Sequence, residues 1–165
     1  MARLREVLER AGFALVRTYI QSGNALVDSE LPAQEVETTV HGIIRSQMGA
    51  DLAIIVRTGA ELEEALERNP YTDGHDLSRV FFVSLARPPP EDKTTELLSW
   101  DLLPEKLAFG HNTAYLYIPG KYGKETLSNN FLEKKLGIPA TMRNFNTMTR
   151  LVAMSREAPE QTGKK

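Results

Sequence analysis

The chain has 165 residues, of which 41% are hydrophobic and 25% charged, and its formal net charge is −2. This composition is typical of one globular domain or two small ones, and it excludes a disordered chain, a fibrous repeat and a polybasic tail. Because the chain contains no cysteine, disulfides, thiolate metal sites and cysteine nucleophiles are excluded as well. No apolar run approaches the ~20 residues of a membrane-spanning helix, and the charged N-terminus differs from a signal peptide.

In the first half of the chain, hydrophobic periodicity and turn residues alternate between helical and extended patterns. A stripe of Leu4, Val7, Leu8 and Ala11 opens the chain as a helix, and five consecutive apolar residues at 52–56 indicate a buried strand. In order, the predicted elements are a helix up to Gly12, a hairpin of strands at 14–19 and 25–27, a helix at 33–48, a strand at 52–56, and a short helix at 58–68 that begins with a capping box.

The second half shows the same alternation after a Pro-, Gly- and Asp-containing segment at 69–78, which is the best candidate for a linker. The predicted elements are a strand at 80–85 buried on both faces, a helix through Leu97 and Trp100, a hairpin of strands at 106–109 and 114–118, a helix at 127–136, an extended piece, and a final helix capped by Asn144 or Asn146.

The order of elements in the second half is that of a split β-α-β unit of the ferredoxin-like type. The first half has the same order without its first strand. We therefore predict an α+β fold of two ferredoxin-like subdomains, the first lacking its first strand. The expected boundaries are 1–70 for the first half, 79–156 for the second half with the C-terminal helix, and 157–165 for a disordered tail.

Several strings of residues resemble a known family of bacterial proteins, called domain of unknown function 1697. The resemblance extends from Met1 to about Met154 and is carried by Thr18–Asn24, Ile55–Arg57, Leu132–Gly137 and Pro139–Thr147. It implies two ferredoxin-like α+β subdomains, in agreement with the pattern of elements, and it implies no established activity.

Members of that family usually begin with an apolar strand before the first helix, whereas Met1 already stands at the start of the helix here. In a ferredoxin-like sheet this strand is central, so its loss leaves two neighbouring strands without backbone partners. Each unpaired buried amide costs roughly 1–3 kcal/mol. We expect one of three explanations: a missed upstream start codon, a truncated gene, or another segment or chain that fills the gap and produces a homo-oligomer.

Charge is distributed unevenly along the chain. Residues 1–120 hold 11 basic and 18 acidic side chains, whereas residues 121–165 hold 9 basic and 4 acidic ones. Such asymmetry is compatible with an anionic partner for the C-terminal part, but a solvated charged face or attraction between the two halves is the more common explanation.

Three polar clusters are candidates for a ligand site. The densest, at the start of the last predicted helix, contains Arg143, Asn144, Asn146 and Thr147, where free backbone N–H groups and a guanidinium would favour an anion. The alternative is a plain helix cap. The turn with Gln21, Ser22 and Asn24 either orients a polar ligand or only closes a hairpin. The loop and helix start with Lys124 and Asn129 resemble a phosphate cradle only in general, because the residues do not match a P-loop.

Established catalytic patterns are absent from the sequence. His41, His75 and His111 lack the ligand spacing of a zinc site, and neither a nucleophile elbow nor a dinucleotide fingerprint occurs. Trp100, Tyr115 and Tyr117 could stack on bases, as in RNA-binding modules with this type of sheet, but the aromatic signature of those modules is absent. Tyr115 and Tyr117 alternate on one face of a strand, which is more typical of a core or its rim.

No specific biochemical function follows from these observations, and three hypotheses remain. The first is a small cytoplasmic binding protein for an anionic ligand, a nucleotide or nucleic acid, with its site between the halves. The second is an enzyme without a metal that acts on a small anionic substrate. The third is a structural or oligomerising protein without a ligand. No cofactor, no metal and no membrane partner are predicted.

Overall fold

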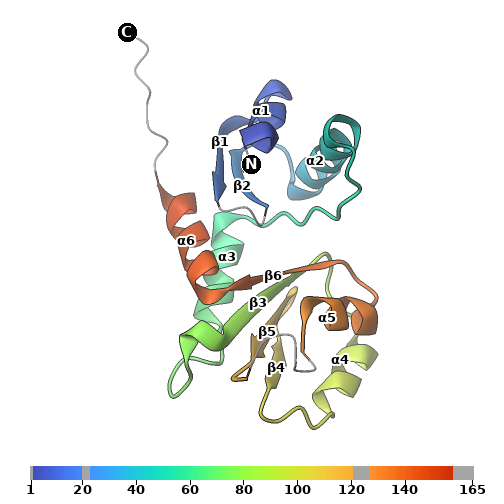
Figure 1. The fold of residues 1–165 in the computed structure, drawn as a ribbon, viewed down its shortest axis with the longest axis vertical. Coiled ribbons are helices and arrows are strands. Elements are labelled where there is room, and N and C mark those ends of the chain that lie inside the picture. Colours follow the sequence, from blue (N-terminus) through green and yellow to red (C-terminus); the bar gives the residue numbers. More distant parts are fainter. Residues whose placement is uncertain (1, 20–22, 121–126, 158–165) are drawn as a thin grey trace. The chain divides into compact units, whose positions relative to one another are not determined.

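The structure, a computed structural model, describes residues 2–19, 23–120 and 127–157. The chain divides into two compact units (Figure 1). Unit 1 contains the residues up to Gly59 together with those from Leu151 onward, and unit 2 contains Ala60–Arg150. Both units combine helices with antiparallel strands, so the fold is α+β as predicted.

Unit 2 is built around a four-stranded sheet with the order β4-β5-β3-β6. All neighbouring strands are antiparallel, and β3 is central because it pairs with β5 on one side and β6 on the other. This is the predicted split β-α-β arrangement. Its elements are β3 (Val80–Leu85), α4 (Glu91–Leu98), β4 (Lys106–Phe109), β5 (Thr113–Tyr117), α5 (Asn129–Leu136) and β6 (Ala140–Asn144).

The sheet of unit 2 buries apolar side chains on both faces, because successive residues of a strand point to opposite sides. On one face, Val83 and Leu85 of β3 pack with Leu97 of α4 and Leu132 of α5. On the other face, Phe82 packs with residues from α3 (Gly59–Glu67), with Tyr71 and with Met148 of α6 (Phe145–Arg156). The prediction that the 80–85 strand is buried on both faces is confirmed.

Unit 1 contains a hairpin and two helices. The hairpin pairs β1 (Ala14–Tyr19) with β2 (Asn24–Asp28), and it is flanked in sequence by α1 (Ala2–Arg10) and α2 (Ala33–Met48). Leu8, Phe13, Val16 and Val36 form its buried core. The second part of α6 also belongs to unit 1, where Arg17 of β1 donates a hydrogen bond from Nη1 to the backbone oxygen of Met154 at 2.8 Å.

Glycines end two of these helices, and the one at Gly12 is predicted from the sequence. Gly12 follows α1 with φ of +96°, and Gly49 caps α2 with φ of +68°. Both values lie in the left-handed region, which glycine adopts without the steric penalty that a Cβ atom imposes. The predicted bounds of the helix at 33–48 are confirmed.

The predicted strand at 52–56 is wrong: residues 51–58 form neither helix nor strand. The equivalent strand of unit 2, β6, pairs with β3 alone, and among the described residues unit 1 has no counterpart of β3. A strand is defined by the backbone partner that it pairs with, so an apolar, extended sequence without that partner forms no ladder.

The segment at 69–78, the candidate for a linker, contributes residues to the core of unit 2. Asn69 and Tyr71 are buried, and the Oδ1 atom of Asn69 accepts a hydrogen bond from the backbone N–H of Tyr71 at 3.0 Å. Tyr71 is part of the apolar cluster on the sheet of unit 2. The compact units divide the chain at Gly59 and Arg150, and the two halves at 1–70 and 79–156 stay a prediction from the sequence.

Two smaller differences concern the ends of helices. Trp100 lies two residues beyond the end of α4, and Leu127 precedes α5, which begins at Asn129 after the capping hydroxyl of Ser128. Most of the predicted tail, residues 158–165, lies outside the described residues. In the part of the chain that the structure describes, no helix has the length and apolar character needed to cross a membrane.

Candidate functional site

The sheet of unit 2 brings polar side chains into rows on the face that lies away from α4 and α5. Strand register places Ser84 of β3 between Thr113 of β5 and Thr141 of β6. Alternate residues of a strand lie on the same face of the sheet. Phe82 and Arg143, which pair two residues away from Ser84 and Thr141, therefore share this face with the three hydroxyl groups. Ser84, Thr141 and Arg143 are partly exposed, whereas Thr113 is buried. Ser84, Thr113, Thr141 and Arg143 are called the polar row below, and solvent can reach all of them except Thr113.

Arg143 is held in place by its own strand. Its Nη1 atom donates hydrogen bonds to the Oγ1 atom of Thr141 and to the backbone oxygen of Met142, both at 2.8 Å. Burial of the guanidinium lowers the pKa of Arg143 below its usual range, because removal from water disfavours the charged form. The group remains charged, since the pKa of arginine is far above neutral. A partly dehydrated and oriented cation attracts an anion more strongly than a fully hydrated one.

The aromatic residues of the same face belong to the core. Tyr115 is only 4% exposed and lies with its ring edge toward Phe82, at 5.7 Å between ring centroids. Burial raises the pKa of Tyr115 above its usual range. Tyr117 packs against the edge of His75 and beside Tyr71. These rings stabilise the core and its rim, and among the described residues of this face they form no free stacking platform for bases.

The cluster at 143–147 forms the junction between β6 and α6. The Oδ1 atom of Asn144 accepts a hydrogen bond from the backbone N–H of Thr147 at 2.8 Å, so Asn144 is the N-cap of α6. Thr147 is buried, whereas Asn146 is exposed in the first turn of the helix. Of the two predicted capping residues, Asn144 has this role.

The remaining candidate residues lie elsewhere. Asn129 stands at the start of α5, where its Nδ2 atom donates to the backbone oxygen of Ala140 at 3.0 Å and so connects that helix to the beginning of β6. Asn24 belongs to unit 1 and closes the hairpin by donating to the backbone oxygen of Tyr19 at 3.1 Å. Gln21, Ser22 and Lys124 lie outside the described residues.

Ser84, Thr113 and Thr141 were not among the residues chosen from sequence. Ser84 and Thr141 have a signal in the sequence, because each alternates with apolar residues in a segment predicted to be extended. Thr113 lies one residue before the strand predicted at 114–118. Only the register across three strands shows that the hydroxyl groups form one row. A single strand contains no information about that register.

Histidine and carboxylate side chains do not gather into a metal site: the described residues include no group of three or more that could hold an ion. His41 lies 2.9 Å from the carboxylate of Asp51. The Nε2 atom of His75 lies 3.0 Å from Nζ of Lys106, at the end of the sheet where Tyr117 and Tyr71 pack.

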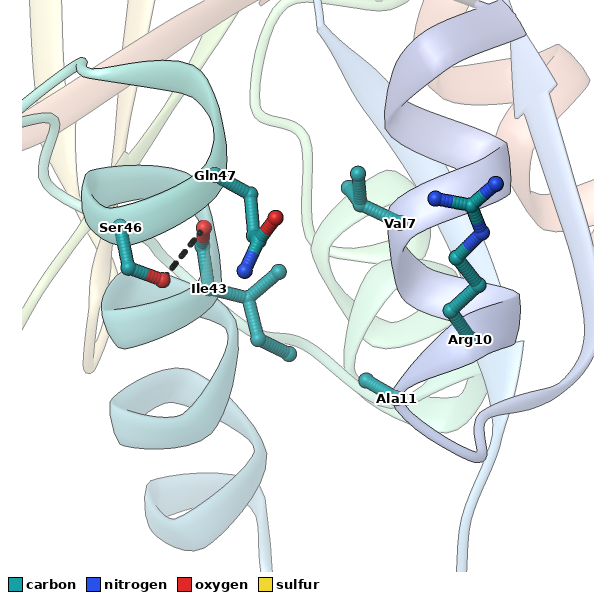
Figure 2. Close-up of a pocket in the computed structure, with 6 residues that line it drawn as sticks. All are labelled: Val7, Arg10, Ala11, Ile43, Ser46 and Gln47. Atoms are coloured by element: carbon teal, nitrogen blue, oxygen red, sulfur yellow. Dashed lines mark hydrogen bonds between the residues drawn. The ribbon is translucent and has the colours of Figure 1, made fainter.

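A separate pocket of about 210 Å³ lies in unit 1, between α1 and α2 (Figure 2). Val7 of α1 and Ala11, which follows the end of that helix, face Ile43 and Gln47 of α2 across it. Its polar lining residues, Arg10, Ser46 and Gln47, are exposed. None of the residues predicted to bind a ligand lines this pocket.

A family model described as a protein of unknown function (DUF1697) matches residues 1–115. The chain belongs to this family. The match includes unit 1 and unit 2 as far as Tyr115, and it ends before Arg143 and the other residues of the β6–α6 junction. Membership of DUF1697 therefore supports the fold and the family resemblance of the sequence, and it assigns no function to the polar row.

The fold of this DUF1697 protein also occurs in a solved structure, that of a conserved bacterial protein from Streptococcus pneumoniae. The match has a TM-score of 0.75 at 22% sequence identity, and it covers 94% of this chain and 88% of that chain. At this identity the likeness shows the fold alone. No protein with a curated description matches the chain.

Proposed function

We propose that this protein binds a small anionic ligand on the sheet of unit 2, at the polar row, beside Arg143, Ser84 and Thr141. The observation that carries the proposal is the geometry of Arg143: a partly buried guanidinium that Thr141 and Met142 orient through two hydrogen bonds of 2.8 Å. A planar guanidinium offers paired N–H donors to a phosphate or carboxylate, and neighbouring hydroxyl groups complete such a site.

Charge and the position of the helix support the same ligand class. Residues 121–165 hold 9 basic and 4 acidic side chains. Arg143 also lies two residues before α6, whose N-terminal end favours negative charge. The burial of Tyr115 and Phe82 disfavours a long single-stranded nucleic acid, because stacked bases need exposed rings. A small phosphate- or carboxylate-bearing molecule is therefore the ligand that this face fits best.

The proposal is tested by titrating the protein with inorganic phosphate and following backbone amide shifts in NMR spectra at low and moderate salt. Arg143→Gln removes the charge, and Arg150→Gln is the matched control because it makes the same charge change at an exposed position of α6. We expect Arg143→Gln to weaken phosphate binding about tenfold or more, the usual effect of losing a charge-assisted hydrogen bond, and Arg150→Gln to weaken it by about twofold at most.

Thr141 supplies a second, independent variant. Thr141→Val keeps the shape of the side chain but removes the hydroxyl that orients Arg143, whereas Thr141→Ser retains it. Weaker phosphate binding in the valine variant alone would support the orienting role. If Arg143→Gln and Arg150→Gln weaken binding equally, the response reflects general electrostatics and the proposed site is refuted. If phosphate causes no shifts near β6, the proposed function is refuted as well.

A further inference from the structure

Exposed apolar side chains gather at the end of α4, in unit 2. Leu98, Trp100 and Leu103 lie within one segment of six residues and are 53%, 37% and 74% exposed. The exposed fraction of Leu103 is the largest among the large apolar side chains of the described residues. Single exposed leucines are common, but several large apolar side chains in one short segment are typical of an interaction surface. These three residues are called the apolar patch below.

The ring of Trp100 connects the apolar patch to α5. Its centroid lies 5.9 Å from that of Phe131, in an edge-on contact, and Nζ of Lys135 lies 4.9 Å from the Trp100 centroid. The two helices lie side by side on the same face of the sheet (Figure 1). A tryptophan that its neighbours already hold in place loses little conformational freedom on binding, and such residues are frequent at the centre of protein interfaces.

The two helices beside the apolar patch carry exposed charges of opposite sign. Glu91, Asp92 and Glu96 of α4 are exposed, and so are Lys134 and Lys135 of α5. Among the described residues none of these five side chains forms an ion pair, although the helices are neighbours. The carboxylates of α4 and the ammonium groups of α5 can therefore pair with charges of another molecule.

This distribution of charge argues for a second copy of the chain as that molecule. A two-fold axis at the apolar patch places α4 of one copy opposite α5 of the other, and symmetry repeats the contact. Acidic groups then face basic groups on both sides of a shared apolar centre. A nucleic acid or an anionic membrane fits this surface poorly, because its exposed carboxylates outnumber its exposed lysines.

We propose that two copies of this protein form a symmetric dimer through the apolar patch, with the carboxylates of α4 facing the lysines of α5 across the interface. The apolar side chains supply the affinity, and the charged rim sets the orientation of the two copies. The inference does not depend on the anion site, because the polar row lies on the other face of the sheet.

The first test measures the self-association of the full chain by analytical ultracentrifugation, from about 1 μM to about 1 mM. We expect a reversible equilibrium between monomer and dimer. Leu103→Asp places a charge in the apolar patch, and Leu31→Asp makes the same change at a residue between β2 and α2 that is 46% exposed. Leu103→Asp should raise the dissociation constant about tenfold or more, because a symmetric dimer contains the residue twice. Leu31→Asp should change it by about twofold at most, and circular dichroism verifies that both variants fold.

Charge reversal tests the orientation of the copies. One variant carries Lys134→Glu and Lys135→Glu, which makes both helices acidic, and the other carries Glu91→Lys and Glu96→Lys, which makes both basic. Each variant alone should self-associate about tenfold more weakly than the parent chain, because like charges then face each other. A mixture of the two should form heterodimers about tenfold or more tighter than either homodimer.

A control pair in unit 1 separates this effect from net charge. Glu30→Lys with Glu35→Lys makes the same change in charge at two other exposed positions. This control should keep the dissociation constant of the parent within about twofold and should show no preference for the acidic variant.

Three results would overturn the inference. A chain that stays monomeric up to about 1 mM would show that the apolar patch serves a different partner. A dimer that Leu103→Asp leaves intact would show that the copies associate through another face. If the two charge-reversed variants form no preferred heterodimer, or if the control pairs with the acidic variant equally well, the charges of α4 and α5 do not face each other.

Discussion

Asn144 is the residue that best separates a capping role from a ligand-binding role at the β6–α6 junction. Its Oδ1 atom accepts a 2.8 Å hydrogen bond from the backbone N–H of Thr147, which α6 itself cannot satisfy. Replacement of such a cap by alanine costs about 1 kcal/mol, within a range of about 0.5–2 kcal/mol. We therefore expect Asn144→Ala to lower the free energy of unfolding by that amount and the melting temperature by about 2–4 °C.

The aspartate variant provides the decisive contrast. Asn144→Asp keeps the accepting oxygen and adds a negative charge at the positive end of the helix dipole, which is worth about 0.3–1 kcal/mol. We expect its stability to equal or exceed that of the parent chain. Asn146→Ala is the matched control, because Asn146 is exposed in the same turn and its loss should change stability by about 0.5 kcal/mol or less.

Urea denaturation followed by circular dichroism measures all three variants. Phosphate titration of Asn144→Ala shows in addition whether this residue contributes to binding, and a pure cap should leave the phosphate affinity near that of the parent. If Asn144→Asp is as unstable as Asn144→Ala, or if Asn146→Ala is the more damaging change, Asn144 does not stabilise α6 as a cap and the argument fails.

Two further predictions concern stability. A Cβ atom at Gly59, where α3 begins, would lie 2.7 Å from Oγ of Ser155 and 2.9 Å from its Cβ, so Gly59→Ala should cost about 1–3 kcal/mol. Ser155→Gly should offset part of this cost in a double-mutant cycle by urea denaturation, whereas strictly additive costs would show that the side chains do not meet. Burial raises the pKa of Tyr71 to about 12, above its value in the unfolded chain. Its contribution to stability is therefore complete below pH 10 and should decline as the pH rises from 10 to 12. Tyr71→Phe, whose stability should fall less over that range, is the control.

The elements that sequence predicted well are those whose causes are local. The helix at 33–48 has an apolar stripe along its length and a glycine directly after its end, and both features act within a few residues. The hairpins in both units follow the same logic, because a short turn sets the pairing of its two flanking strands. For the same reason Asn144 could be proposed as a cap before the structure placed it there.

The candidate site was only partly accessible from sequence, and its geometry shows why. Arg143 attracts attention as a cation in a polar string, but its orientation depends on the hydroxyl of Thr141, and the accompanying Ser84 lies 57 positions before Thr141 in the chain. These residues meet through the pairing of β3 with β6, a contact between distant segments. Helix and strand periodicity describe one element at a time. They predict on which face of that element a side chain lies, but not which residues of other elements lie beside it.

The contrast between β6 and residues 52–56 makes the same point for a whole element. Residues 52–56 follow α2 and β6 follows α5, so the two correspond in the order of elements. The 52–56 sequence has the stronger intrinsic preference for a strand, with two isoleucines and a valine. Yet β6 forms a ladder with β3, and residues 52–56 form none. Apolar sequence therefore makes a segment able to become a strand, and the backbone partner decides whether it does.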